Sequence, residues 1–302
     1  MCKKSGMESK LFIYVALAAD LGIAVTKFVA AGFTGSASML SEGIHSVIDC
    51  VNQLLLLLGI KRSQKKADIS RPFGYGRELY FWSFIVSLLL FSLGGCISVY
   101  QGIIRLQRPA GNEDQTWSYI VLGVSFLFTA ASLVVSVKKF NKLRGKLGFL
   151  TAVHKSKDPA LFIVLLGDFG DLVGLLIAFF GIYLAHLFHN SYYDGIASMV
   201  IGVFLIILSL LLVRESWSLL MGETVSKETL DDIIKITESD DAVVKVKHHF
   251  STYLAPEEVV LQMLTVFEDD LDTEDITDAI KRISRNISGK FPRIKQIFIE
   301  PV

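Results

Sequence analysis

Residues 158–185 read DPALFIVLLGDFGDLVGLLIAFFGIYLA, an apolar stretch whose length decides the class of this protein. A helix needs ~20 apolar residues to cross the hydrocarbon core of a bilayer. Asp158 and Pro159 form a typical helix start, with a capping side chain followed by proline in the first turn. The sequence therefore predicts that a helix beginning here spans a membrane.

Similar apolar stretches recur along the chain. Together they predict six membrane helices, at 11–33, 38–60, 79–105, 116–137, 159–186 and 194–216. The first one follows Lys3, Lys4 and Lys10, as the apolar part of a signal peptide would. Its apolar run continues to Ala31, however, well past the length of the apolar region of a signal peptide, so we expect a retained span.

The charges of the connecting loops predict the orientation. Loop 61–78 carries six Lys and Arg residues and loop 138–157 carries seven, whereas loops 32–38 and 187–193 carry no charge. Because basic loops stay in the cytoplasm, both termini are expected there. An even number of spans requires the same arrangement. Short loops and a compact length favour a prokaryotic cytoplasmic (inner) membrane.

The overall composition excludes several function classes. The 302 residues are 52% hydrophobic and 20% charged, with a formal net charge of +0, so we expect no nucleic-acid partner. Cys2, Cys50 and Cys96 are scattered and form no CxxC pair. They indicate neither a disulfide framework nor a thiolate metal site. We also expect no bound cofactor.

The composition changes after Val213, where charges become dense and long apolar runs end. The patterns predict, in order, a helix, two strands, a helix and a strand, at 226–238, 242–253, 258–267, 273–288 and 294–300. This order is typical of a ferredoxin-like, or metallochaperone-like, α+β domain. Its expected core is Ile233, Ile234, Val244, Val246, Val260, Leu264, Ile280 and Ile283. We therefore divide the chain into an N-terminal tail (1–10), a six-helix membrane domain (11–213) and a cytoplasmic domain (214–302).

The second expected span carries a polar face. Ser38, Ser41, His45, Asp49 and Asn52 recur every three or four residues, which places them on one side of a helix. An imidazole and a carboxylate one turn apart can bind the same cation. The alternative is a polar stripe that joins helices through hydrogen bonds. Ionised groups at bilayer depth are costly and usually functional, which favours the cation site.

The fifth expected span adds Asp168 and Asp171, three residues apart on one helix face. Two carboxylates in an apolar helix repel each other unless they are protonated or bound to a cation. The alternative is a protonated or salt-bridged pair of structural acids. With His45 and Asp49 the two helices offer one nitrogen and up to three carboxylates, a set that suits Zn²⁺ and also admits Mn²⁺, Fe²⁺ or Co²⁺.

Two further charges lie in the first expected span. Asp20 and Lys27 are about two helical turns apart, so they can pair with each other or with a neighbouring helix. Asp20 can also belong to an ion path, and Asn52 on the second span is a further candidate for that path. The sequence leaves the structural and the functional reading open for these side chains.

Several segments together resemble one family. They are TGSASMLSEGIHSVIDCVNQLLLLLG at 34–59, RPFGYGRELYFWSFI at 71–85, DGIASMVIGVFLI at 194–206, LLMGETVSKETLDDI at 219–233 and IKQIFIEPV at 294–302. These segments resemble the cation diffusion facilitators, a family of exporters of zinc and related divalent metals. The resemblance extends over nearly the whole chain.

The resemblance implies a homodimer in which each protomer has six membrane helices and its own transport site. It implies export of a divalent metal in exchange for protons, by a secondary-active transporter and not an enzyme. In the family the ligands come as pairs four residues apart on the second and fifth helices. Here His45 and Asp49 match the first pair and Asp171 matches the last ligand, but Gly167 cannot ligate, so Asp168 is expected to substitute.

Two other function classes are weighed against transport. A membrane-anchored metal sensor or scaffold leaves the polar residues inside the membrane unexplained. An intramembrane metalloenzyme needs a general base and an open metal position, and the sequence contains no HExxH segment. It also contains no GxxxxGK[ST] segment, so a transport cycle that uses proton exchange and not ATP is expected.

Overall fold

The computed structural model describes residues 14, 17–18, 20–29, 32, 37–107, 115–144, 157–190 and 192–302. The chain divides into two compact units. A membrane unit comprises Met1–Gln64 and Glu78–Trp217, and a C-terminal unit comprises Lys65–Arg77 and Ser218–Val302. The boundary thus lies four residues beyond the one expected from composition, and a loop from the first half of the chain belongs to the C-terminal unit.

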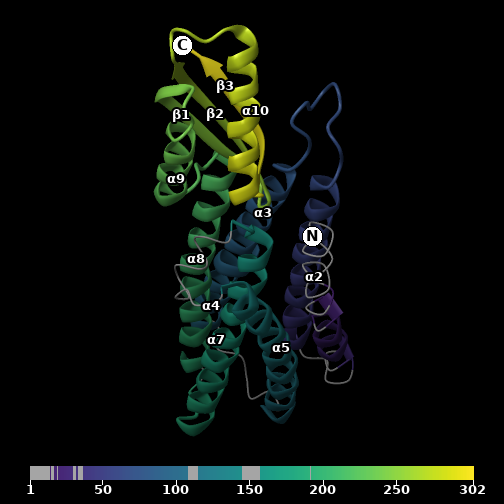
Figure 1. Ribbon diagram of the computed structural model, residues 1–302. Helices are drawn as coiled ribbons and strands as arrows, with labels where there is room; N and C mark the ends of the chain where they lie inside the picture. The colour runs from purple at the N-terminus through teal and green to yellow at the C-terminus, as the bar shows by residue number, and fades with distance from the viewer. Residues whose placement is uncertain are drawn as a thin grey trace. The chain divides into compact units, whose positions relative to one another are not determined.

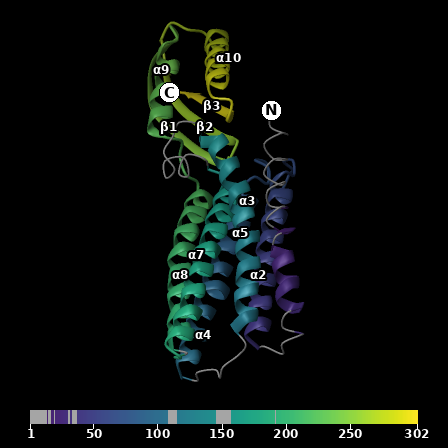
Figure 2. The same ribbon diagram turned by 90° about the horizontal axis from the view of Figure 1, so that it is seen from below.

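The membrane unit is a bundle of long helices (Figure 1). The described ones are α2 (Ala37–Ser63), α3 (Glu78–Leu89), η1 (Leu90–Cys96), α4 (Ile97–Gln107), α5 (Gln115–Arg144), α7 (Pro159–Leu187) and α8 (Tyr192–Met221). Residues 20–29 of the first expected span are also helical. Figure 2 shows α7 running between α5 and α8, in agreement with its contacts to both.

Four described helices are long and apolar enough to cross a membrane. They are Glu78–Gln107, Tyr119–Lys138, Pro159–Leu187 and Tyr192–Met221. They coincide with the third to sixth expected spans, so these four predictions are confirmed by length and composition. The helix α2 covers the second expected span, while the first expected span lies partly outside the described residues.

The start of α7 forms as its sequence predicts. Asp158 occupies the N-cap position in an extended conformation, and Pro159 follows in the first turn. The Asp158 side chain makes no cap hydrogen bond, so the proline and the apolar residues after it define this helix start. Ala160 to Leu165 are buried in the core of the unit together with Leu56 of α2 and Phe140 of α5.

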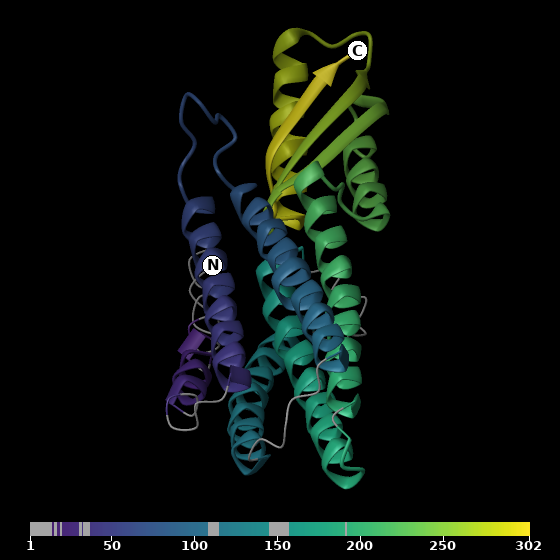
Figure 3. The same ribbon diagram turned by 180° about the vertical axis from the view of Figure 1, so that it is seen from behind.

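The third expected span is one continuous helical run with a π-helical segment in its middle. The π segment, Leu90–Cys96, joins α3 to α4, and Figure 3 shows the run between α2 and α8. Its second half packs closely on α8, since a Cβ added at Gly202 would lie 2.6 Å from the backbone nitrogen of Val99. Small residues allow such close helix crossings in membranes. Segments of π-helix are frequent at functional sites.

The C-terminal unit has the predicted order of elements. It consists of α9 (Lys227–Glu238), β1 (Val243–Ala255), β2 (Glu258–Phe267), α10 (Thr273–Lys290) and β3 (Ile294–Pro301). The strand order is β1-β2-β3, with β1 and β2 antiparallel and β2 and β3 parallel. As expected, Ser226 caps α9 by accepting a hydrogen bond from the backbone of Thr229.

The core of this small domain differs in part from the predicted one. Ile233 and Ile283 are fully buried as expected, and so are Leu261 and Met263 of β2, which were not predicted in the core. Side chains alternate along a strand, so Val260 and Leu264, which were expected in the core, lie on the other face and are only partly buried. Val244 is 50% exposed, so its assignment to the core is wrong. Apolar residues occupy both faces of β2, so the sequence does not indicate which face is buried.

The loop Lys65–Arg77 packs against β1 within the C-terminal unit. Its carboxylate Asp68 accepts a hydrogen bond of 2.6 Å from the Tyr75 hydroxyl, and the Arg71 guanidinium lies 4.5 Å from the centre of the Tyr75 ring. A Cβ added at Gly76 would lie 2.6 Å from the carbonyl oxygen of Leu254, so this contact requires glycine. The PFGYG segment thus packs as an ordered part of the C-terminal unit.

Candidate metal site

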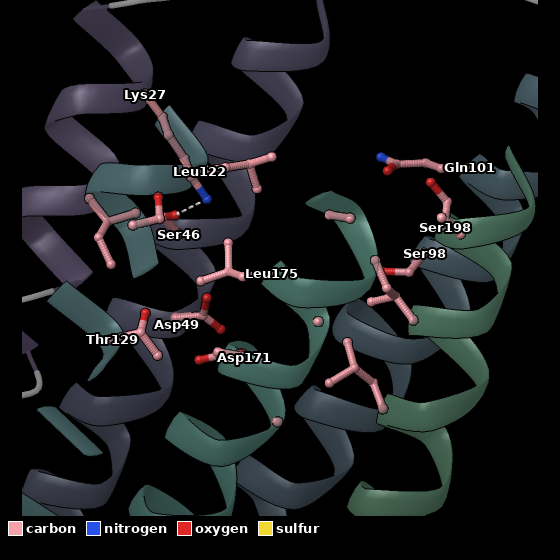
Figure 4. Close-up of a pocket in the computed structure, with 18 of the residues that line it drawn as sticks. Lys27, Ser46, Asp49, Ser98, Gln101, Leu122, Thr129, Asp171, Leu175 and Ser198 are labelled. Carbon is pink, nitrogen blue, oxygen red and sulfur yellow. Dashed lines mark hydrogen bonds between the residues drawn. The ribbon is translucent and has the colours of Figure 1, made fainter. Parts of the chain in front are cut away.

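A cavity of about 240 Å³ lies among the helices of the membrane unit. Three of the carboxylates that line it lie at one end and come from three helical segments: Asp20 from residues 20–29, Asp49 from α2 and Asp171 from α7. Figure 4 shows the carboxylates of Asp49 and Asp171 pointing toward each other from facing helices. The structure therefore brings together one acid from each of the two predicted ligand pairs.

The electrostatic environment of Asp171 shows that the clustered carboxylates require a compensating positive charge. Its carboxylate is repelled by Asp49, by Asp20 and by Asp168, and it is attracted by Lys27. Like charges at short distance in an apolar helix bundle are unfavourable without a compensating charge. A cation or protons can supply that compensation, and carboxylate oxygens are suitable ligands for a divalent metal.

His45 lies in α2, one helical turn before Asp49. Its side chain lies outside the described residues, so its predicted role as a ligand stays a prediction. Among the described side chains, no group of three or more His, Cys, Asp or Glu residues is arranged to hold a metal ion. The described part of the site thus consists of the facing pair Asp49 and Asp171, with Asp20 on the same cavity.

Asp168 faces a different neighbour. Ser132 and Ser136 of α5 donate hydrogen bonds of 2.8 Å and 3.1 Å to its Oδ2 atom, and its side chain is buried. The hydroxyls hold this carboxylate toward α5, whereas Asp171 lines the cavity. The two acids of α7 are therefore three residues apart but occupy different surroundings.

A stripe of hydroxyl side chains on α5 also belongs to this region, although none of its members is among the predicted site residues. Ser125, Thr129, Ser132 and Ser136 recur every three or four residues along the fourth expected span, so they share one helix face. All four are buried. The first two line the cavity and the other two bind Asp168. A hydroxyl stripe in an apolar helix marks the face that meets polar neighbours, and this spacing is the signal in the sequence that could have located it.

The side chains of Asp20 and Lys27 each reach α2. Asp20 Oδ2 accepts a hydrogen bond of 2.5 Å from Gln53 Nε2, and Lys27 Nζ donates one of 3.0 Å to Ser46 Oγ. Both residues line the cavity. Asn52, by contrast, is buried outside the cavity lining, and its Oδ1 accepts no hydrogen bond from the described residues.

The cavity also has a second polar end. Arg105 of α4 forms an ion pair with Asp194 in the first turn of α8. Ser98 and Gln101 of α4 lie near Ser198 of α8, as Figure 4 shows on the side away from Asp49 and Asp171. One cavity therefore connects the carboxylates to a polar stretch between α4 and α8.

Comparison with known proteins agrees with this architecture. The family model described as the cation efflux transmembrane domain matches residues 13–221, more than half of the chain. The human protein named proton-coupled zinc antiporter SLC30A9, mitochondrial, is 34% identical over 219 residues, which are 72% of this chain and 39% of that protein. This chain thus spans about two fifths of the length of that relative.

Two other relatives are more distant. Metal tolerance protein C4 of Arabidopsis thaliana is 27% identical over 70% of this chain and 46% of that protein. Magnetosome protein MamB of Magnetospira is 27% identical over 93% of this chain and 90% of that protein. With the family model and the helices of the membrane unit, these likenesses show that the chain belongs to the cation diffusion facilitator family of metal cation transporters.

Proposed function

We propose that this protein exports a divalent transition metal across its membrane in exchange for protons and binds the metal between α2 and α7. The observation that carries the proposal is the facing pair Asp49 and Asp171, which come from two different apolar helices and line one cavity. Charged groups inside a membrane protein are rare and mark ion pathways. The relatives named proton-coupled zinc antiporters support both the ion and the exchange.

The proposed ligands are His45 and Asp49 from α2, with Asp171 and Asp168 from α7. Asp168 has to leave Ser132 and Ser136 to reach the metal, or a water takes the fourth position. A site rich in oxygen admits Mn²⁺, Fe²⁺ and Co²⁺ beside Zn²⁺.

The same residues explain why protons would be exchanged. Carboxylates and imidazole bind either a metal ion or protons, so the two compete for one site. Bound metal neutralises the carboxylates in one state, and protons neutralise them in the other, which keeps the charge inside the membrane low. An imidazole changes its charge near neutral pH and is suited to this exchange. The protein acts in this scheme as a secondary-active transporter, with no chemical step.

The wider architecture in this proposal has six membrane helices, both termini in the cytoplasm and a ferredoxin-like C-terminal domain. The proposed location is a prokaryotic cytoplasmic membrane. A homodimer is supported by the sheet, since Val244, Phe250 and Phe298 are each at least 50% exposed. Exposed apolar side chains on a small domain favour docking with a second copy.

Flux in sealed vesicles tests the proposal. The full chain is reconstituted into proteoliposomes, and Zn²⁺ uptake is followed with and without an imposed pH gradient. We expect uptake that is accelerated when protons are driven out as Zn²⁺ enters, and that falls to the rate of empty vesicles when the gradient is reversed. Zn²⁺ binding without flux would instead identify a membrane-anchored metal sensor. Flux that ignores the pH gradient would contradict proton exchange.

A further inference from the structure

Lys27 is the one described cationic side chain that lines the carboxylate end of the cavity. Its side chain is only 6% exposed and lies in the first membrane helix, where a buried ammonium is costly. Figure 4 shows it entering the cavity beside Asp49 and Asp171, with its Nζ 3.0 Å from Ser46 Oγ. Lys27 also attracts the carboxylates of Asp171 and Asp20. The ammonium thus donates a hydrogen bond to a hydroxyl of α2 and also attracts acids of the site.

The charges at this end of the cavity add up to a value that one divalent metal ion can neutralise. Of the acids that line this end, Asp20, Asp49 and Asp171 carry three negative charges when ionised, and Lys27 carries one positive charge, so their sum is −2. Asp168 is not counted, because in this structure it is hydrogen-bonded to Ser132 and Ser136 and does not line the cavity. One divalent cation brings this sum to zero. Without Lys27 the sum would be −3, and a bound divalent cation would leave an uncompensated charge inside the membrane.

A lysine can serve this purpose because its ammonium is a compact charge on a flexible four-carbon chain. The ammonium can approach the carboxylates when the metal has left and return to Ser46 when a metal binds. Carboxylate oxygens would accept its hydrogen bonds in the first position, and Ser46 Oγ accepts one of 3.0 Å in the second, which is the position in this structure. When the metal binds, it then replaces the Lys27 ammonium as the cation beside the carboxylates.

We propose that Lys27 is a tethered counter-cation of the metal site, which fits the site to one divalent ion and competes with that ion for the carboxylates. This assignment rests on the proposed function. Lys27 acts as a positioning residue and does not ligate the metal. It weakens equilibrium binding, and in return it speeds the release of the metal from a cluster of acids.

The test compares Lys27→Met with Lys27→Arg in the full-length protein. Methionine keeps the length and removes the charge, while arginine keeps the charge. We expect Lys27→Met to lower the Kd for Zn²⁺ in detergent by about tenfold or more, because one positive charge near the metal is removed at an effective dielectric constant of ~20. In proteoliposomes its KM and its turnover should both fall. Lys27→Arg should stay within about threefold of the wild type, on the same reasoning.

A merely structural lysine would give another pattern, with weaker binding and no recovery by arginine, and this pattern would overturn the assignment. An unchanged Kd in a folded Lys27→Met variant would overturn it as well. If that variant does not fold, Zn²⁺ binding by Ser46→Ala tests the role of Lys27 instead. This substitution removes the alternative partner of the ammonium, so Zn²⁺ should bind about threefold more weakly, and equal or tighter binding would overturn the assignment. A wild type that binds none of Zn²⁺, Mn²⁺, Fe²⁺ and Co²⁺ would overturn the proposed function itself, whereas normal wild-type binding with unaffected variants would overturn only the role of Lys27.

Discussion

The acidic residues of the two units are placed in opposite ways. In the C-terminal unit, Asp240 pairs with Arg282 and Asp232 pairs with Lys290, so each acid has a basic partner that is about half exposed. In the membrane unit, Asp20, Asp49 and Asp171 line one cavity together with a single lysine. Surface pairs contribute little to stability and are common in soluble domains. Carboxylates gathered inside an apolar bundle are unfavourable for folding and therefore indicate function.

Within the membrane unit the same contrast separates neighbours on one helix. Asp168 accepts two hydrogen bonds from serines of α5, so the fold supplies partners for it. Asp171 instead faces Asp49, a group of its own charge. Hydrogen bonds stabilise the ionised form of a buried carboxylate, whereas a nearby second carboxylate destabilises it. Asp171 and Asp49 are therefore the residues most directly suited to bind a cation.

Removal of these acids should have the largest effect. We expect Asp49→Ala and Asp171→Ala each to abolish Zn²⁺ transport in proteoliposomes, because each removes a charged ligand from a site that has few. Asp168→Asn should lower Zn²⁺ affinity by about tenfold, a typical loss when the groups around a metal site are altered. The measurements are Zn²⁺ uptake and a binding isotherm on purified protein.

Asp232→Asn is the matched control for these variants, since Asp232 forms its ion pair in the C-terminal unit. It should transport at nearly the wild-type rate. Near-normal uptake by a folded Asp49→Ala or Asp171→Ala variant would contradict the proposed metal site, which depends on both acids. Equal losses in Asp168→Asn and Asp171→Ala would show that the contrast between the two acids has no functional consequence.

Local patterns in the sequence were sufficient for most of the fold. The elements of the C-terminal unit could be placed because helical and alternating periods differ and Ser226 marks a helix start. The inner face of β2 could not, since apolar residues occupy both faces of that strand. The attachment of loop Lys65–Arg77 to the C-terminal unit depends on contacts between residues far apart in the chain, which periodicity does not encode.

The same limit applies to the site. The spacing of Asp49 on the second span and of Asp171 on the fifth identified two acids on helix faces, and the structure brings these two together. The sequence could not tell that Asp168 turns to α5, because Ser132 and Ser136 lie more than 30 residues earlier in the chain. Nor could it tell that the hydrogen bonds of Asp20 and Lys27 reach α2.

A substitution at position 167 tests which side of α7 faces the metal, and its expected effect is smaller than that of removing Asp49 or Asp171. Gly167 lies four residues before Asp171, and an added Cβ there meets no described atom within 4 Å. We expect Gly167→His to shift binding toward Zn²⁺ over Mn²⁺ by about tenfold, because imidazole suits Zn²⁺ and completes a tetrahedral site. Competition between the two ions on wild type and variant measures this. An unchanged preference in a folded variant would mean that position 167 does not face the metal.

The smallest expected effect concerns the ion pair Asp240 and Arg282 of the C-terminal unit, in which the acid faces a basic side chain and not a second acid. The Arg282 guanidinium donates hydrogen bonds of 2.7 Å and 2.6 Å to the carboxylate and so holds the pKa of Asp240 below its ordinary value. Because the pKa is lower in the folded state, the pair stabilises the domain above the unfolded-state pKa of ~4, and this stabilisation is lost as the pH falls through the folded-state value. We expect Asp240→Asn to lower the free energy of unfolding of residues 214–302 by about 1 kcal/mol at pH 7 and by a smaller amount at pH 3. Urea unfolding at the two pH values measures the difference, with Asp278→Asn as the control, since its partner Lys281 and Asp278 itself are both more than 60% exposed. An equal loss at both pH values would show that Asp240 acts through packing and not through its charge.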